Sequence, residues 1–343
     1  MKAMTTIQKI RHKLIPNWAR KAYYTYLKKK EYEKMLHMPE SEYEAYLCER
    51  YKEMLNRSER TRGLQMDFDD PVTYSQKMQW MKLYDLSDEK TICSDKYAVR
   101  DYIANKLGEE YLIPLICIDG KDCFHSADEI DFDKLPNKFV MKCNHGSHYN
   151  IIVKDKSRLS AKEVKQIKRK LNAWLREKYE FKVGLELYYK GIEPAIIIEK
   201  YMEIDDDLPD YKFYCFEGEV KFVFCMEGRL SEVRQSYFDK DFNKLAFTMP
   251  FGSKIDYPDV TFGKPENYEK MLEIAQLLCK DFSHVRVDLY NLNGRIYFGE
   301  LTFCSASGYE VTHPMEYDQI IGDWIKIDQS KRENNYRYRN RKG

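Results

Sequence analysis

Two acidic side chains near the carboxyl end of the chain have the residue types and spacing of a metal site. Asp288 and Glu300 lie on the two arms of a predicted hairpin, VRVDLYNLNGRIYFGEL. Carboxylates on neighbouring strands can share magnesium ions that bridge the phosphates of a nucleotide. Arg286 precedes Asp288 by two residues and therefore shares its strand face. Surface acids are the simpler interpretation, but both acids have apolar neighbours, and inward charges there need partners.

The turn near Asn293-Gly294 decides whether the two acids face the same way. A two-residue turn would pair Asp288 with Gly299 and leave the acids on opposite faces of the hairpin. A loop of three or five residues with a bulge would bring them together. We therefore predict a loop of odd length.

A lysine at the end of an apolar strand precedes a polar loop in FVMKCNHGSHYN. Lys142 can point there at the inner phosphates of a nucleotide, while backbone amides of the loop cover the outer ones. The loop residues predicted to bind the cofactor are His145, Gly146 and Ser147. The segment is no Walker A motif, because GxxxxGK[ST] is absent. Taken alone, an ordinary hairpin with a solvated lysine explains it better.

The apolar strand IIIEKYM is followed by polar residues. This pattern is typical of a hinge whose backbone forms hydrogen bonds with the edge of an adenine ring. The predicted hinge residues are Glu199, Lys200, Tyr201 and Met202. The acids from Glu203 to Asp207 can take ribose hydroxyls, although a buried strand with a solvated acidic end is the better explanation of this segment alone. On the next strand, DYKFYCF, Lys212 can neutralise charge that develops on a γ-phosphate.

Composition excludes several classes of protein. The 343 residues are 43% hydrophobic, enough for a large core in two or three packed units and too apolar for a disordered chain. The nine cysteines form no CxxC pair and the seven histidines no HExxH, so we expect reduced, mostly buried thiols and no catalytic zinc. The sequence contains neither an apolar run of 18 residues nor a cleavable signal pattern, so we expect a cytoplasmic protein.

The net charge is only +1, but positive and negative residues are distributed unevenly along the chain. Residues 1–30 carry nine Lys/Arg and no acid, and the tail from Lys331 carries six bases against one acid, which leaves the middle at −13. Nucleic acid is therefore not an expected partner, and a polyphosphate would need placed lysines and Mg²⁺. The basic, amphipathic N-terminus can contact an anionic membrane at its inner face, and docking on the protein body explains it equally well.

Alternating helical and strand patterns indicate an α+β fold with mostly antiparallel sheets. Strand-like runs are expected at 111–120, 139–143, 150–155, 196–202, 211–218, 219–226 and in the final hairpin. Helices are expected near the N-terminus and at 39–57, 73–84, 95–108, 161–178 and 267–282.

With these elements in this order, the sequence resembles the ATP-grasp superfamily, and within it the TupA-like group. That group is encoded among bacterial surface-polysaccharide (capsule) genes and often labelled glycosyltransferase. The resemblance covers about three quarters of the chain. It is carried by the motifs PVTYSQKMQWMKLYD, DKYAVRDYI, FVMKCNHGS, IIIEKYM, DYKFYCFEGEV, VRVDLY and GELTFCSASG.

The resemblance implies an ATP-grasp-like fold, in which two α+β lobes hold ATP and Mg²⁺ in a cleft. It divides the chain into a helical extension at 1–88, a first lobe at 89–200, a metal-binding lobe at 201–328 and a basic tail at 329–343. Lys142 and Lys212 would contact phosphates, the loop around Gly146 would cover the γ-phosphate, and the hinge would bind adenine. Asp288 and Glu300 would hold Mg²⁺, and Thr302 stands where many ATP-grasp enzymes have a metal-binding asparagine.

By the same resemblance, the substrate is a carboxylate-bearing sugar or amino acid of a cell-surface glycan. Its carboxylate would attack the γ-phosphate, Arg286 would steady the acyl phosphate, and an amine would displace phosphate to give an amide. The segment Ser305 to Gly308 and the side chain of His313 are candidates for the acceptor site.

Three other functions stay open on the sequence. Asp205 and Asp207 form a DxD, which a nucleotide-sugar glycosyltransferase uses to hold a metal, although three-residue acidic motifs are common by chance. An ATP-dependent kinase on the same lobes would transfer phosphate to a hydroxyl. A non-enzymatic scaffold at the membrane would use the basic ends and leave the central acids unexplained.

Overall fold

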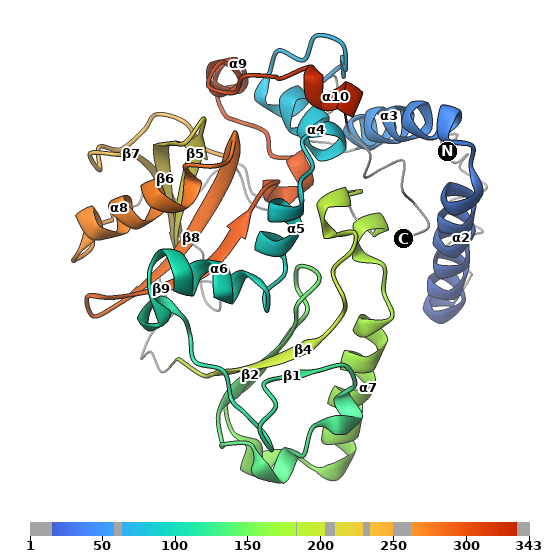
Figure 1. Ribbon diagram of the computed structural model, residues 1–343, viewed down its shortest axis with the longest axis vertical. Helices are drawn as coiled ribbons and strands as arrows, with labels where there is room; N and C mark the ends of the chain where they lie inside the picture. The colour runs from blue at the N-terminus through green and yellow to red at the C-terminus, as the bar shows by residue number, and fades with distance from the viewer. Residues whose placement is uncertain are drawn as a thin grey trace.

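Two antiparallel sheets with separate hydrophobic cores form the protein (Figure 1). The computed structural model describes residues 16–57, 64–182, 184–202, 210–228, 234–249 and 262–334. The α+β fold class predicted from the sequence is confirmed. Residues 1–15, the acids from Glu203 to Asp207 and the tail beyond residue 334 lie outside the described part, so the predictions made on them stay predictions.

The larger sheet has the strand order β7-β6-β5-β8-β9. Its strands are β5 (Asp210–Phe216), β6 (Glu219–Glu227), β7 (Arg234–Asp239), β8 (His284–Leu292) and β9 (Arg295–Thr302). The turn between β5 and β6 has positive φ at Glu217 (50°) and Gly218 (74°), which matches the right-handed twist of paired strands. Helix α8 (Tyr268–Cys279) packs on one face of the sheet, against β5, β6 and β8 (Figure 1). Strand β5 is central in this sheet, and each of its residues is buried.

The smaller sheet has the order β1-β4-β2-β3. Its strands are β1 (Cys123–Phe124), β2 (Phe139–Cys143), β3 (Asn150–Val153) and β4 (Ile196–Lys200). Helix α7 (Ala161–Leu175) begins with a capping box in which Ser160 and Glu163 satisfy each other's backbone amides. Leu171 of this helix is fully buried against β2 and β4, and Trp174 packs at the edge of the same core.

The N-terminal helices extend the core of the larger sheet. They are α2 (Asn17–His37), α3 (Glu40–Arg57), α4 (Tyr74–Tyr84), α5 (Asp88–Ser94) and α6 (Val99–Lys106). Tyr43, Leu47 and Tyr51, spaced four apart, are buried on α3 as the sequence pattern predicts. They share one hydrophobic cluster with the aromatic face of α4 and with the five-stranded sheet.

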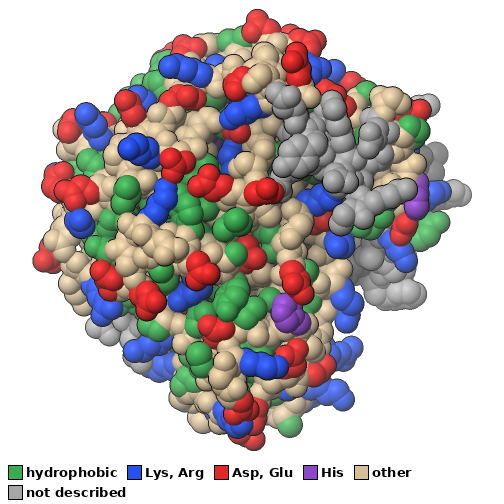
Figure 2. Space-filling view, viewed as in Figure 1, with side chains coloured by type: hydrophobic (Ala, Val, Ile, Leu, Met, Phe, Trp, Pro, Cys, Tyr) green, Lys and Arg blue, Asp and Glu red, His purple; other side chains and the backbone are tan. Residues whose placement is uncertain are grey.

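Short helices complete the described chain. They are the 3-10 helices η1 (Glu109–Tyr111), η2 (Ala127–Glu129), η3 (Phe132–Lys134), η4 (Lys156–Arg158), η5 (Tyr179–Phe181), η6 (Leu187–Tyr189) and η7 (Ser305–Gly308), with α9 (Glu316–Gly322) and α10 (Ser330–Asn334). None of the helices in the described ranges is both long and apolar enough to span a membrane. On the face shown in Figure 2, acidic and basic side chains are interspersed.

Two sequence predictions about strands need correction. The apolar run at 111–120 is not a regular strand, because it forms only two isolated bridges, Leu115 with Glu199 and Ile118 with Lys121, and Pro114 lacks the N–H that a ladder needs. Strand β7 was not predicted, since its residues RQSYFD show little apolar alternation. It is stabilised by pairing with β6, a contact that local pattern does not reveal.

A buried ion pair fastens the end of the chain to the N-terminal helices. Asp85, at the end of α4, contacts Lys90 of α5 at 2.5 Å and Lys331 of α10 at 2.7 Å. Burial by itself raises the pKa of Asp85, but the two ammonium groups hold that pKa well below its usual range. Burial lowers the pKa of Lys90, and the Asp85 carboxylate opposes that shift.

We expect Asp85→Ala to lower the free energy of unfolding by about 3–5 kcal/mol, because it leaves the buried Lys90 ammonium without its partner. Asp69→Ala is the matched control, since the Asp69 side chain is 86% exposed beside Arg332 and its loss should cost less than about 1 kcal/mol. Urea unfolding measures both. In the wild type, the stability that Asp85 contributes is present above its unfolded pKa of about 3.9 and is lost as pH falls toward its lower folded pKa. Equal losses in the two variants would refute this account.

Candidate active site

A buried cluster of charges lies on the face of the larger sheet opposite α8. Asp288, only 3% exposed, accepts from Lys212 Nζ at 2.5 Å across the β5–β8 pair. It also accepts from Arg286 through Nε to Oδ1 at 2.7 Å and Nη2 to Oδ2 at 2.8 Å. Asp210, not singled out from the sequence, adds a second carboxylate 3.6 Å from Lys212. The predicted side chains Lys212, Arg286 and Asp288 are therefore in direct contact.

A bulge, and not an odd loop, aligns the two predicted metal ligands. Leu292 pairs with Arg295, so the turn is the two-residue Asn293-Gly294 type, and the prediction of an odd-length loop is wrong. The register shifts between Asp288 and Leu289, which places Asp288 opposite Glu300. The prediction that the two acids share one face is confirmed. Gly299 forms the bulge where a Cβ atom would lie 3.0 Å from the Asp288 carbonyl oxygen.

Glu300 lies at the open side of this cluster, with its side chain 43% exposed. Partial burial raises its pKa, but Lys96, Arg286, Lys212 and Lys142 together lower that pKa to about 2. Arg286 Nη2 donates to Glu300 at 3.2 Å and to the Thr302 hydroxyl at 3.0 Å. Glu300 is therefore ionised throughout the neutral range.

The carboxylates fit Mg²⁺ by their chemistry. No group of three His, Cys, Asp or Glu side chains with metal-ligand geometry occurs among the described residues. Mg²⁺ prefers hard oxygen donors and commonly takes one or two protein carboxylates, with nucleotide phosphates and water supplying the rest. Asp288 and Glu300 are such a pair, and the Thr302 hydroxyl lies 3.2 Å from Glu300.

The smaller sheet supplies the second set of cations. Lys142 on β2 forms an ion pair with Glu199 of the adjacent strand β4 at 2.5 Å. Lys96 donates to the Gly146 carbonyl at 2.7 Å, and it lies within electrostatic reach of Lys142, Glu199 and Glu300. Burial lowers the pKa of Lys96, while the two glutamates oppose that shift. Lys96 therefore connects the charges of the two sheets.

The sequence alone does not assign a role to Lys96, although this residue lies in the motif DKYAVRDYI. The residues around Lys96 explain its position. Asp95 Oδ1 accepts from the backbone amides of Tyr97 and Ala98, and from the side-chain amide of Asn144, which fixes the start of the helical segment. The neighbouring lysine is thereby held against the loop after β2.

The loop after β2 packs closely against neighbouring side chains and backbone. The His145 ring is 3% exposed, with Nε2 3.1 Å from the Trp174 carbonyl, and burial lowers its pKa. A Cβ atom on Gly146 would lie 2.5 Å from the Tyr179 ring, so only glycine fits there, whereas Ser147 is exposed. His145 therefore supports the loop in this structure. Its contact with a cofactor, like those of Gly146 and Ser147, stays a prediction.

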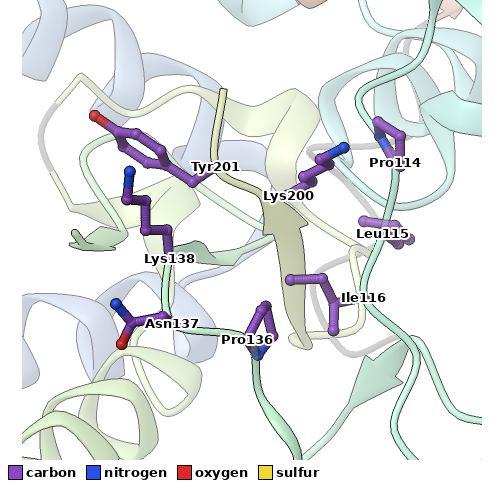
Figure 3. Close-up of a pocket in the computed structure, with 8 residues that line it drawn as sticks. All are labelled: Pro114, Leu115, Ile116, Pro136, Asn137, Lys138, Lys200 and Tyr201. Atoms are coloured by element: carbon purple, nitrogen blue, oxygen red, sulfur yellow. The ribbon is translucent and has the colours of Figure 1, made fainter. Parts of the chain in front are cut away.

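The predicted hinge borders a pocket of about 490 Å³ at the end of β4. Figure 3 shows its lining, with Lys200 and Tyr201 from the hinge facing residues 114–116 and 136–138. Neither Lys142 nor any member of the charge cluster lines this pocket, so we place the chemistry at the cluster and not in the pocket. Met202 is half-buried at the end of the described hinge.

The predicted acceptor residues separate in the structure. Ser305 accepts from Arg286 Nη1 at 2.6 Å, which places the SASG segment directly against the charge cluster. His313 instead exchanges backbone hydrogen bonds with Thr248. Within the described part of the chain, no hydrogen bond or ion pair joins the His313 side chain to the cluster.

Comparison with known proteins places this arrangement in a family. A sequence model of the TupA-like ATP-grasp family matches residues 76–326. Similar solved structures include the D-alanine–D-alanine ligase of Bacillus anthracis, with 16% identity, coverage of 71% of this chain and 70% of that chain, and a TM-score of 0.37. The D-alanine–D-alanine ligase of Helicobacter pylori has 11% identity, coverage of 74% and 69%, and a TM-score of 0.35.

The ATP-grasp ligase PsnB, in its structure with a minimal precursor, Mg and ADP, has 12% identity and a TM-score of 0.32. The match covers 67% of this chain and 57% of PsnB, so it spans a little over half of that protein. No curated protein matches the chain.

We expect Gly146→Ala to lower the free energy of unfolding by about 1–3 kcal/mol, because its methyl group would overlap the Tyr179 ring. Gly263→Ala is the matched control, since nothing lies within 4 Å of a Cβ there. Chemical denaturation of these variants and of Gly146→Ala/Tyr179→Ala tests the cause. If the overlap is responsible, the double variant loses less stability than the two single changes predict together. Strict additivity would contradict it.

Proposed function

Because the chain belongs to the TupA-like ATP-grasp family, we propose that it is an ATP- and Mg²⁺-dependent ligase that joins a carboxylate to an amine through an acyl phosphate. Family membership supports an ATP-dependent ligase as the class of enzyme. The observation that carries the proposal is the charge cluster, in which Lys212, Arg286, Asp288 and Glu300 meet on one sheet face and Lys96 links them to the other sheet.

The nucleotide would lie between the two sheets, with its phosphates toward the cluster. In this arrangement Lys142 and Lys96 neutralise phosphate oxygens from the smaller sheet, and Lys212 does so from the larger one. The exposed Ser147 and the Gly146 backbone cover the outer phosphates. The hinge from Glu199 to Met202 presents its backbone to the adenine.

Asp288 and Glu300 would hold Mg²⁺. Bound there, the ion would neutralise phosphate charge and would polarise the γ-phosphate. The protein's own contribution is to keep the Glu300 carboxylate ionised, which the surrounding lysines and Arg286 achieve. Thr302 supports this arrangement through its hydrogen bond to Glu300.

The proposed reaction has two balanced steps. A substrate carboxylate oxygen forms a bond to the γ-phosphorus while the bond from that phosphorus to the β-phosphate oxygen breaks, and ADP leaves. The amine nitrogen then bonds to the acyl carbon, the acyl–phosphate bond breaks, and inorganic phosphate and a proton leave. Arg286 and Lys212 stabilise the charge on the transferred phosphoryl group, because their N–H groups are already oriented before the reaction.

The substrate class rests on the family resemblance. We propose a uronic acid or amino acid of a bacterial surface polysaccharide, or of its precursor, as the carboxylate. That substrate would enter from the open side of the cluster, where the Glu300 side chain is 43% exposed. We also propose that the basic N-terminal residues contact an anionic membrane surface, where such glycans are assembled.

We expect Mg²⁺-dependent binding of AMPPNP, measured by isothermal titration, to weaken at least about 100-fold in Asp288→Ala/Glu300→Ala, because the metal ligands are removed. Glu300→Gln is the milder variant and should weaken it about tenfold without unpairing Lys212. Glu269→Ala/Glu273→Ala, which removes two exposed acids from α8, is the charge-matched control. Binding of a UDP-sugar but not of AMPPNP, lost in Asp205→Ala/Asp207→Ala, would instead establish the glycosyltransferase.

The reaction class has its own test. Wild-type protein with ATP, Mg²⁺ and hydroxylamine as the amine should convert a uronic acid or amino acid to its hydroxamate and release one ADP and one phosphate per product. Arg286→Lys should lower this rate about 100-fold or more, because lysine cannot reproduce the bidentate contact to Asp288. A phosphate ester without hydroxamate would identify a kinase.

A further inference from the structure

Behind Arg286 lies a buried carboxyl group that the proposed reaction does not use. Glu310 is 7% exposed and accepts a hydrogen bond from the Ser305 hydroxyl at 2.7 Å. Ser305, 2% exposed, accepts in turn from Arg286 Nη1 at 2.6 Å. Since a hydroxyl has one proton and Ser305 gives it to Glu310, its oxygen can only accept from Arg286. The three side chains therefore form a directional chain.

The donors of Arg286 are almost fully used. A guanidinium has five N–H groups. The Nε–H group and one N–H group of Nη2 donate to Asp288, and the second N–H group of Nη2 is shared by Glu300 and Thr302. One N–H group of Nη1 donates to Ser305. The remaining Nη1 proton is the group's one donor that forms no hydrogen bond within the described chain. Rotation of the guanidinium would change the direction of this free N–H group, and the hydrogen bond to Ser305 opposes that rotation.

The backbone beyond Ser305 is held in an unusual conformation. Ala306 (φ 44°) and Ser307 (φ 57°) are both left-handed, which is rare for residues with a side chain. The Ser307 hydroxyl donates to Glu186 at 2.5 Å, and Lys82 donates to the Ser307 carbonyl at 2.9 Å. These contacts from two other segments fix the turn that presents Ser305.

We propose that Ser305 and Glu310 are positioning residues that orient the Arg286 guanidinium toward the γ-phosphate and the acyl phosphate formed from it. This inference rests on the proposed function. It assigns to the SASG segment a task on the phosphate side of the reaction, separate from contact with the acceptor.

Stability gives a readout that a purely structural role would not reproduce. Burial raises the pKa of Glu310 above its usual value, although Ser305, Arg286 and Tyr214 oppose this. A carboxyl group whose folded pKa is raised contributes stability below its unfolded pKa and loses it as pH rises through the folded pKa. The charged form of Glu310 is therefore disfavoured in the folded protein, which loses stability as pH rises through the folded pKa of this group. Its neutral isostere, glutamine, should leave the melting temperature at pH 8 unchanged or raised.

The experiment compares Mg·ADP with Mg·AMPPNP by isothermal titration on the full chain. In Ser305→Ala and Glu310→Gln we expect affinity for Mg·AMPPNP to fall roughly tenfold and affinity for Mg·ADP to change less than about twofold. Ser305→Thr keeps the hydroxyl and should therefore retain most of the wild-type affinity for Mg·AMPPNP. Ser94→Ala is the matched control, because Ser94 is also a buried serine (6% exposed) and its hydroxyl donates to the Lys90 carbonyl, away from the chain to Arg286.

Each outcome separates the two proposals. Loss of γ-phosphate selectivity in Ser305→Ala and Glu310→Gln, without a lower melting temperature in Glu310→Gln, supports the positioning role. Variants that bind both nucleotides like the wild type, or that lose both in parallel with a lower melting temperature, overturn it and leave the proposed function standing. A wild-type protein that binds neither nucleotide with Mg²⁺ overturns the proposed function, and the positioning role with it.

Discussion

The buried Asp288 carboxylate is the constraint on which the rest of the site depends. A single charge in that position would cost several kcal/mol, so it persists only with compensating partners of good geometry. Lys212 and Arg286 supply them from two adjacent strands. The same pairing fixes both cations on one sheet face and leaves Glu300, across the bulge, as the more exposed acid. The ion pairs that compensate the charge of Asp288 therefore also set the positions of the side chains in the candidate active site.

The helices outside the two sheets keep this arrangement rigid. Helix α4 is anchored through Lys82, whose ammonium donates to the carbonyls of Gly184 and Ser307 and whose pKa burial lowers to about 8. One buried lysine thus joins the N-terminal extension to the segment before β4 and to the turn beside Ser305. Because that turn is strained, it keeps its shape only while such contacts hold it.

The two sheets meet through electrostatics as well as through packing. Lys96 belongs to the segment before α6, bonds to the loop after β2 and lies within reach of Glu300. A nucleotide placed between the sheets would add negative charge where four cations already converge on one carboxylate. Under the proposed function, these cations would let a chain with an acidic middle region hold a polyphosphate.

The sequence by itself determined the periodic elements and most of the charged residues of the site, because apolar spacing on α3 and α7 and the two hairpins are local properties. It also determined that Arg286 and Asp288 share a face. Only the tertiary structure decided the rest. The bulge at Gly299 depends on pairing with β8, β7 exists through its partner β6, and the Lys96 and Glu310 contacts join residues far apart in the chain. Such features depend on backbone pairing and on side-chain contacts that only the folded chain brings together, and the apolar pattern of a single segment does not encode them.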